Sequence, residues 1–212
     1  MNIETLRQQY MQEGLQRSLL SNNPYQMFEA WFEQSINSGI PEPSAMSLAT
    51  VDVSGQPWQR MVLLKFYDEK GFVFFTNYSS RKAAHIAENS KVSLLFPWHA
   101  LGRQVKITGT ASKISTAESL KYFITRPRGS QIGAWASPQS QVITGRATLD
   151  AKVDEMKQKF KQGEIPLPSF WGGYRVSSDT VEFWQARDDR LHDRFIYRQN
   201  KSYEWVIERL AP

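Results

Sequence analysis

The sequence predicts an α+β fold in which helices surround an antiparallel β-barrel, with all 212 residues in one domain. Two observations favour this fold. From residue 44 to 112, short strand-like segments follow one another, and turn residues in "VSGQ" and "YDEKG" join the first three. Segments with a helical period flank and interrupt this region, and no internal repeat or low-complexity linker divides the chain.

The first two predicted elements are helices over residues 3–18 and 24–38. The second helix has Met27, Phe28 and Trp31 at helical spacing, which is typical of a helix that buries one face. Antiparallel strands follow. We expect them over residues 45–53, 57–66, 72–77, 91–98 and 104–114.

Three more helices and four more strands complete the predicted order. The helices are expected over residues 80–89, 115–127 and 147–162. Ser115 and Glu118 have the spacing of a capping box, and Pro127 is placed to stop the helix that they begin. The last strands are expected over residues 174–178, 180–185, 191–198 and 203–209.

The composition excludes several classes of protein. Hydrophobic residues make up 41% of the chain and aromatic residues 13%, which is typical of a packed globular protein. The chain has no cysteine, so disulfides, thiolate nucleophiles and cysteine metal ligands are excluded. The net charge of +5 would attract anions, but the basic residues form no block, so nucleic-acid binding is the weaker alternative.

The first residues, "MNIETLRQQYMQEGLQRS", are polar and amphipathic and lack the apolar core of a signal peptide. No segment approaches the roughly 20 apolar residues that span a bilayer. We therefore expect a cytoplasmic protein that does not bind a membrane.

Cationic or potentially cationic residues alternate in "RLHDRF", residues 190–195. In an extended strand Arg190, His192 and Arg194 would share one face, because successive side chains alternate between faces. Such a stripe repels itself unless water or an anion compensates its charge. The pattern alone favours a solvated strand face over an anion-binding site.

Two further groups of residues are candidates for binding an anion. Arg81 and Lys82 fall in the first turn of the third predicted helix, where the helix dipole disfavours cations unless a phosphate binds there. Solvated side chains are an equally good interpretation. Tyr122 and Arg126 lie four residues apart on one helix face and Ser130 follows, which would suit a phosphate clamp, although surface placement is commoner for this pattern.

Arg60 and Lys65 differ by an odd number, so a regular strand would point them to opposite faces. If both contact one ligand, a bulge or a ligand that reaches round the strand is required. The three histidines show neither HxH nor HExxH spacing, so no metal site is expected. GxSxG, Walker and GxGxxG motifs are also absent, and a redox reaction would need an organic cofactor.

Several uncommon strings that contain tryptophan or arginine occur together in this chain. They are "RQVKITG" (103–109), "TRPRGSQIGAW" (125–135), "PLPSFWGGYRV" (166–176), "EFWQ" (182–185) and "RLHDRF" (190–195). In this order they closely resemble the strings of the pyridoxamine 5'-phosphate oxidase family, bacterial type, and the resemblance covers nearly all of the chain.

The resemblance implies an FMN-binding split β-barrel, antiparallel and Greek-key-like, in a homodimer with two flavin sites between the subunits. It implies oxidation of pyridoxamine or pyridoxine 5'-phosphate to pyridoxal 5'-phosphate, a reaction of vitamin B6 metabolism. Hydride would pass to flavin N5, and O2 would reoxidise the flavin and yield H2O2. The rival interpretation is a flavin carrier or a pyridoxal phosphate reservoir with the same fold.

The resemblance also assigns residues to the site. FMN would contact Arg60, Met61, Val62, Leu63, Leu64, Lys65, Phe75, Thr76, Arg81, Lys82, Gln104, Gln139, Ser140, Trp184 and Arg194. The substrate would contact Arg7, Tyr10, Lys65, Tyr122, Arg126, Ser130, Arg190 and His192. Arg190 and His192 would act at the reacting carbon, and the helical segment 1–20 would close over the substrate. Phe75, where the family often has tyrosine, and Glu42, where aspartate is usual, depart from the pattern.

Overall fold

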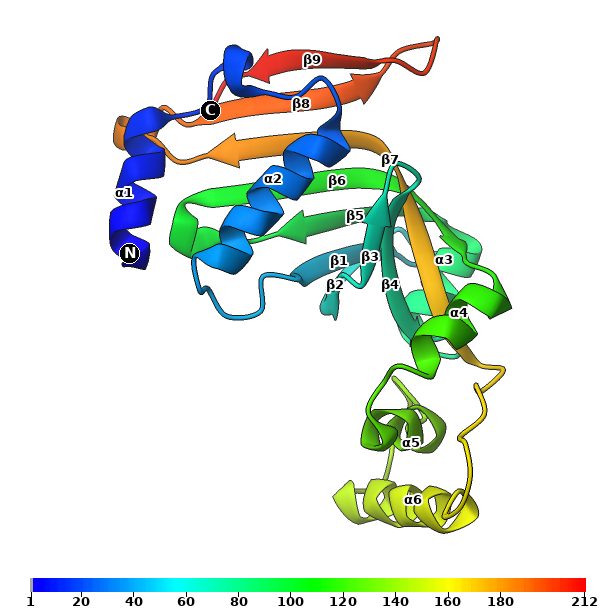
Figure 1. The fold of residues 1–212 in the computed structure, drawn as a ribbon. Coiled ribbons are helices and arrows are strands. Elements are labelled where there is room, and N and C mark those ends of the chain that lie inside the picture. Colours follow the sequence, from blue (N-terminus) through cyan, green and yellow to red (C-terminus); the bar gives the residue numbers. More distant parts are fainter. Residues whose placement is uncertain (1) are drawn as a thin grey trace.

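The structure is a computed structural model that describes residues 2–212. Within this range nine strands form one antiparallel sheet in the order β2-β1-β5-β6-β7-β4-β3, and β8 and β9 extend it beside β7 (Figure 1). The sheet curves but does not close. The predicted α+β class is therefore confirmed, with an open barrel at its centre.

The bounds of the strands and helices follow the chain. The strands are Ala45–Val51 (β1), Pro57–Leu63 (β2), Phe66–Asp68 (β3), Gly71–Asn77 (β4), Lys91–Phe96 (β5), Arg103–Lys113 (β6), Trp171–Gln185 (β7), Asp193–Gln199 (β8) and Trp205–Leu210 (β9). The helices are Ile3–Glu13 (α1), Pro24–Asn37 (α2), Arg81–Glu88 (α3), Thr116–Phe123 (α4), Arg128–Ala136 (α5) and Arg146–Lys159 (α6). None of the helices described is both long and apolar enough to cross a bilayer.

The strand β7 connects the two parts of the sheet. It pairs with β6 along most of its length, with β4 along its first half and with β8 along its second half. The sequence predicts two strands here, 174–178 and 180–185, but the structure has one. The register against β6 shifts between Thr108 and Gly109 and leaves Asp179 unpaired in that ladder. Such a bulge bends a strand, and β7 bends in this region (Figure 1).

A hydrophobic core lies between α2 and one face of the sheet (Figure 1). Phe28 is fully buried, and its ring centroid lies 4.8 Å from that of Phe72 and 4.9 Å from that of Phe96. Trp31, one turn further along α2, meets Phe183 of β7 at 5.2 Å. Each such aromatic side chain contributes about 1.5 to 3 kcal/mol when it is fully buried. The predicted apolar face of this helix is therefore confirmed.

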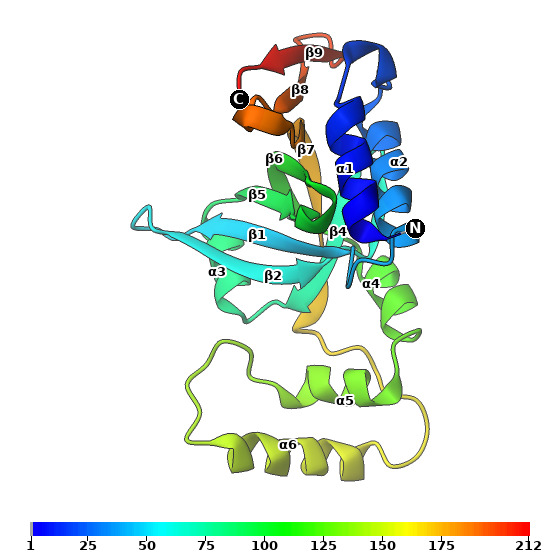
Figure 2. The same ribbon diagram turned by 90° about the vertical axis from the view of Figure 1, so that its left-hand side faces the viewer.

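A second, smaller hydrophobic cluster lies at the start of β7, where α5 and α6 run side by side beyond the end of the sheet (Figure 2). Phe123, Ile132, Met156 and Phe160 are buried in it together with Trp171, the first residue of β7. This cluster fixes the chain on both sides of the link between α4 and α5.

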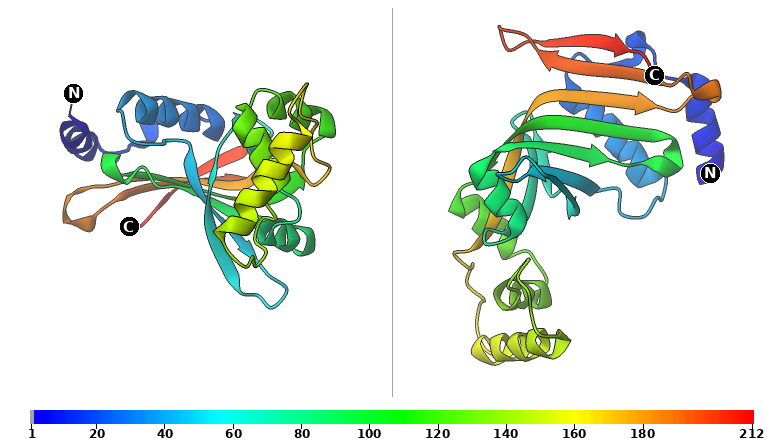
Figure 3. Two further views of the ribbon diagram at one scale, coloured as in Figure 1. Left: turned by 90° about the horizontal axis from the view of Figure 1, so that it is seen from below. Right: turned by 180° about the vertical axis from the view of Figure 1, so that it is seen from behind.

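The opposite sheet face carries no helix of the described chain over β5 to β8, as Figure 3 shows from behind. Gln104, Lys106, Trp184 and Arg194 lie on this face and are half-buried. A face with this mixture of polar and aromatic side chains remains available for a further protein surface.

Several predicted elements differ from those of the structure. The first helix was expected to reach residue 18 but ends at Glu13, because Gly14 takes a φ of 65° and its N–H bonds to the Tyr10 carbonyl. The helix α5 was not predicted, since Pro127 was taken only as a stop signal, whereas it is the N-cap of this helix. The strand expected over 191–198 begins at Asp193.

Candidate active site

A cavity of about 330 Å³ opens between β2, β4, α3 and α4. It is lined by Arg60, Met61, Val62, Leu63, Lys65, Phe75, Thr76, Lys82, Tyr122, Arg126, Gln139 and Trp171. All of these residues except Trp171 were predicted to contact FMN or substrate. The tryptophan was missed although it stands in one of the strings that carry the family resemblance.

The chain leaves β2 in a way that lets Arg60 and Lys65 line the same cavity. The Leu64 N–H bonds to the carbonyl of Ser44 at 2.9 Å, whereas the Lys65 N–H bonds to that of Val73 in β4, also at 2.9 Å. The chain therefore passes from one part of the sheet to another, and strict alternation ends. The Leu64 side chain is 5% exposed in the core and does not line the cavity.

Arg60 is held in the cavity wall by neutral acceptors. Its Nη1 donates to the Leu48 carbonyl at 3.0 Å and to Thr50 Oγ1 at 2.7 Å. Thr50 Oγ1 lies 3.0 Å from Nδ1 of the buried His85. Burial, and then the charge of Arg81, lower the pKa of Arg60. The guanidinium is oriented without a carboxylate to neutralise it.

Lys82 contributes a second buried cation from the first turn of α3. Its Nζ donates to Thr76 Oγ1 and Gln139 Oε1, both at 3.0 Å, and to Ser80 Oγ at 3.3 Å. Burial, and then the charge of Arg60, lower its pKa to about 8. Its neighbour Arg81 instead lies over the Trp58 ring at 4.4 Å, so the two cations of this turn point to different surroundings.

Three aromatic rings stack along the cavity. Tyr122 lies 4.2 Å from Phe75, and Phe75 lies 5.2 Å from Trp171, centroid to centroid. Burial raises the pKa of Tyr122, so its phenol keeps its proton near neutral pH. Phe75 contacts both rings through its own ring and needs no hydroxyl for this stack.

Arg126 lies at the inner end of the cavity. Its guanidinium is 4.7 Å from the Trp171 ring centroid, and its Nη1 is buried without a hydrogen-bond partner in the part of the chain that the structure describes. Burial lowers its pKa. The sequence placed Tyr122 and Arg126 on one helix, but α4 ends at Phe123 and Arg126 follows in the turn before α5.

Ser130, in the first turn of α5, lies near this arginine. It lines an adjoining cavity of about 240 Å³ that shares Arg126, Gln139 and Trp171 with the first. Ser140, in contrast, is exposed and lies outside both cavities. The structure therefore brings Ser130 to the predicted phosphate clamp, whereas Ser140, which was assigned to FMN, does not line the cavity.

A second cluster of predicted residues lies where β6, β7 and β8 run together. Trp184 pairs in register with Gln104 on one side and with Arg194 on the other. The His192 ring lies 4.6 Å from that of Trp184. The Arg187 N–H donates to His192 Nδ1 at 3.1 Å, so in neutral His192 the proton is on Nε2.

The predicted stripe of Arg190, His192 and Arg194 on one strand face is wrong. Arg190 ends a short 3-10 turn with a φ of 61°, and β8 begins only at Asp193. Arg194 donates to Glu182 Oε1 at 2.9 Å. Burial would raise the pKa of Glu182, but hydrogen bonds from Arg194 and Lys106 outweigh it and hold this pKa below its usual range.

The N-terminal helix lies beside the second cluster. The Arg7 side chain is next to Gly102, and the Tyr10 ring lies 3.7 Å from the Arg103 guanidinium. Burial lowers the pKa of Arg103 to about 10. Asp193 accepts a hydrogen bond from the Leu15 N–H at 3.0 Å, which joins the end of the N-terminal segment to the loop that carries His192.

The cavity and the second cluster lie at different ends of β7. Phe75 pairs with Gly173 near the start of β7, whereas Arg194 pairs with Trp184 near its end. The separation of eleven residues corresponds to roughly 35 Å along the strand. One chain therefore does not bring all the predicted site residues together.

The fold is that of the split-barrel proteins, and solved structures support this class. PhzG from Burkholderia lata, in complex with tetrahydrophenazine-1-carboxylic acid, matches with a TM-score of 0.86 and 28% identity over 92% of this chain and 95% of that chain. A pyridoxamine 5'-phosphate oxidase-related, FMN binding protein from Nostoc punctiforme matches with a TM-score of 0.71 and 17% identity over 91% of this chain and 100% of that chain.

Sequence comparisons define the family. The model of pyridoxamine 5'-phosphate oxidase matches residues 32–160, and that of the pyridoxine 5'-phosphate oxidase C-terminal dimerisation region matches residues 171–212. The pyridoxine/pyridoxamine 5'-phosphate oxidase of Crocosphaera subtropica is 58% identical over 100% of both chains. That of Yersinia enterocolitica is 56% identical over 100% of this chain and 97% of the relative. The chain belongs to the pyridoxamine 5'-phosphate oxidase family.

Proposed function

We propose that the chain is an FMN-dependent oxidase that converts pyridoxamine or pyridoxine 5'-phosphate to pyridoxal 5'-phosphate. The observation that carries this proposal is the buried, unpartnered Nη1 of Arg126, in a cavity that Arg60 and Lys65 also line. A buried cation without a partner is costly, and a phosphate group would satisfy it with charge-assisted hydrogen bonds. The family membership supports the same reaction.

The donor groups of the cavity fit FMN. Arg60 and Lys82 would hold its phosphate, because the half-buried Arg60 and the buried Lys82 both donate to neutral oxygens within the described chain. The segment 61–63 and Thr76 would line the rest of its site. When bound, FMN supplies the acceptor for the substrate's hydride, and O2 then takes up the electrons as H2O2.

Lys65, Tyr122, Arg126 and Ser130 would hold the substrate phosphate. Arg126 stays protonated although burial lowers its pKa, and the Tyr122 phenol stays a donor because burial raises its pKa. Four donors on one phosphate fix the position of the attached ring, which lowers the entropic part of the barrier.

The active unit would be a homodimer in which the second cluster of one protomer completes the cavity of its partner. Arg190 and His192 would then orient the substrate ring, with His192 Nε2–H as a donor, and Trp184 and Arg194 would contact FMN. The helix-free face of β5 to β8 and the match of residues 171–212 to the dimerisation region support this arrangement. In each protomer the whole chain would act as one domain.

The test is a direct assay of the protein reconstituted with FMN. After the visible spectrum has been recorded, pyridoxine 5'-phosphate is added in air, and aldehyde and H2O2 are followed together. We expect both products to form in equal amounts. A yellow protein that forms neither product would instead be a flavin carrier, and a protein without flavin absorbance would contradict both interpretations.

A further inference from the structure

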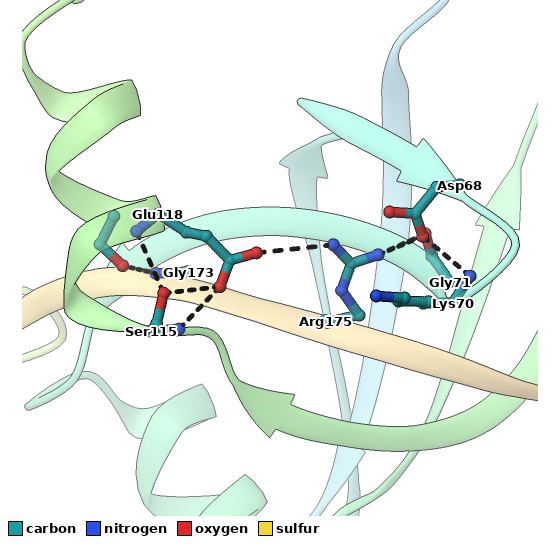
Figure 4. Close-up of polar contacts among 8 residues, drawn as sticks. Asp68, Lys70, Gly71, Ser115, Glu118, Gly173 and Arg175 are labelled. Atoms are coloured by element: carbon teal, nitrogen blue, oxygen red, sulfur yellow. Dashed lines mark hydrogen bonds and ion pairs between the residues drawn. The ribbon is translucent and has the colours of Figure 1, made fainter.

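Arg175 of β7 connects two elements that carry candidate substrate ligands (Figure 4). Its Nη1 donates to Asp68 Oδ1, and its Nη2 lies 3.8 Å from Glu118 Oε1. The Arg175 side chain is only 20% exposed. It does not line the cavity that contains Arg126. It lines a groove of about 540 Å³ on the other side of Tyr122, which contributes to both.

The contact with Asp68 fixes the position of Lys65. Asp68 ends β3, a strand of three residues that begins immediately after Lys65. The Lys65 N–H bonds to the carbonyl of Val73, and Val73 pairs in register with Arg175. The Arg175 side chain and the β4–β7 ladder therefore hold both ends of the short segment that presents Lys65.

The contact with Glu118 fixes the position of α4. Glu118 belongs to a capping box in which its N–H bonds to Ser115 Oγ at 3.1 Å, and its Oε2 accepts the Ser115 N–H at 3.0 Å. Its second oxygen, Oε1, is left to face Arg175. Tyr122 follows one turn later on the same helix.

Further contacts hold α4 against the start of β7. α4 approaches β7 at Gly172 and Gly173, where the Gly173 N–H donates to Ser119 Oγ at 3.3 Å. A Cβ on Gly172 would come within 3.0 Å of Ser119 Oγ, so the missing side chain permits this close approach. Phe123 at the end of α4 is fully buried, with its ring centroid 5.3 Å from that of Trp171, and the ion pair with Arg175 adds a contact to β7 nearer the start of the helix.

We propose that Arg175 is a positioning residue that sets the spacing between Lys65 and Tyr122, and through it the fit of the substrate phosphate. This inference rests on the proposed function of the same site. An isolated exposed ion pair contributes little to stability, but here one half-buried guanidinium joins two carboxylates on separate elements. Its principal effect is therefore on geometry, and it is specific to the phosphate end of the substrate.

The test compares Arg175→Met and Arg175→Lys with the native enzyme loaded with FMN. Three quantities are measured: the KM of pyridoxine 5'-phosphate, the inhibition constant of pyridoxal, which has no phosphate, and the Kd of FMN. In Arg175→Met we expect the KM to rise about tenfold, the equivalent of one charge-assisted hydrogen bond, while the other two constants change less than about twofold. In Arg175→Lys we expect the KM of pyridoxine 5'-phosphate to lie between the native value and that of Arg175→Met.

Arg198→Met is the matched control, because Arg198 also lies on a strand and pairs with one carboxylate, that of Glu208, but is half-exposed. It should leave all three constants unchanged. An unchanged KM in Arg175→Met, or an equal rise of the KM and of the pyridoxal constant, would overturn the inference. If Arg175→Met does not bind FMN, Asp68→Asn tests the contact between Arg175 and Asp68. We then expect the KM of pyridoxine 5'-phosphate to rise about threefold, and an unchanged KM would contradict the inference. Failure of the native protein to oxidise pyridoxine 5'-phosphate would contradict the proposed function instead.

Discussion

Two cations of the cavity, Arg60 and Lys82, donate to neutral oxygens within residues 2–212, and Nη1 of a third, Arg126, has no hydrogen-bond partner there. No ion pair found within residues 2–212 includes Arg60, Lys82 or Arg126. Arg194, in contrast, is paired with Glu182. Positive charge in the cavity is therefore left for an anion to neutralise, and its field is strengthened by burial. This difference distinguishes Arg60 and Arg126, proposed to bind phosphate groups, from Arg194, whose charge is already paired.

The pKa of Lys82 predicts a pH dependence of FMN binding. This pKa is lowered to about 8, so the ammonium is mostly present at pH 7 and mostly lost at pH 9. A bound phosphate favours the charged form and raises the pKa, so protons and FMN bind together. We expect the Kd of FMN, measured by fluorescence titration, to rise between pH 7.5 and 9 by up to about tenfold per pH unit.

Lys82→Arg is the control, because a guanidinium does not titrate in this range. The Kd of FMN should then be nearly constant from pH 7.5 to 9. A native Kd that does not change over this range would show that Lys82 does not bind the phosphate as an ammonium ion.

At the residue scale, the structure places some of the predicted site residues in the cavity and others elsewhere. Arg60, Lys82 and Arg126 line it. Leu64 was assigned to FMN, but its side chain is in the core, and Arg81 lies over Trp58 outside the cavity. No sequence pattern indicates which of the two adjacent cations, Arg81 or Lys82, points into the cavity.

At the scale of elements, the strand periods were predictable and the strand connections were not. The alternation of buried residues identifies β1 and β5, where buried and half-buried positions alternate. It does not reveal that β7 is one continuous strand containing Asp179, which has no partner in the ladder with β6. The sequence places a helix stop at Pro127 and predicts no helix directly after it, yet α5 begins at Arg128, because burial of Ile132 in the second cluster outweighs the weak helix propensity of Gly129.

The β3–β4 turn, which presents Asp68 to Arg175, depends on Gly71. Gly71 has a φ of +128°, and a Cβ there would lie 2.0 Å from the Val176 carbonyl oxygen in β7. Both the backbone conformation and the contact exclude a side chain. We expect Gly71→Ala to lower the free energy of unfolding by about 2 kcal/mol or more, as measured by urea denaturation.

Gly129→Ala is the comparison for this variant. Gly129 lies in α5, where a Cβ would meet no atom within 4 Å, so alanine should leave stability unchanged or raise it by up to about 1 kcal/mol. Equal loss of stability in both variants would mean that the contact with β7 is not what requires glycine at position 71.

At the scale of the whole molecule, the proposed active site takes its two groups of residues from two chains. The cavity at the start of β7 contains Arg126, and the cluster at its far end contains Arg190 and His192. A closed two-fold dimer would bring each cluster to the partner's cavity in two equivalent sites. The sequence could not show this separation, because the family strings give the order of the site residues along the chain but not the course of β7 in space.

The measurement that tests this account most directly is complementation between two inactive variants. Arg126→Met disables the cavity and Arg190→Met disables the second cluster, so each homodimer should have little activity at low substrate concentration. When the two chains are unfolded together and refolded with FMN, half of the dimers are mixed, and one of their two sites combines an intact cavity with an intact cluster. We predict recovery of about one quarter of the native activity. No recovery, with mixed dimers present, would mean that each site is built within a single chain and would contradict the account.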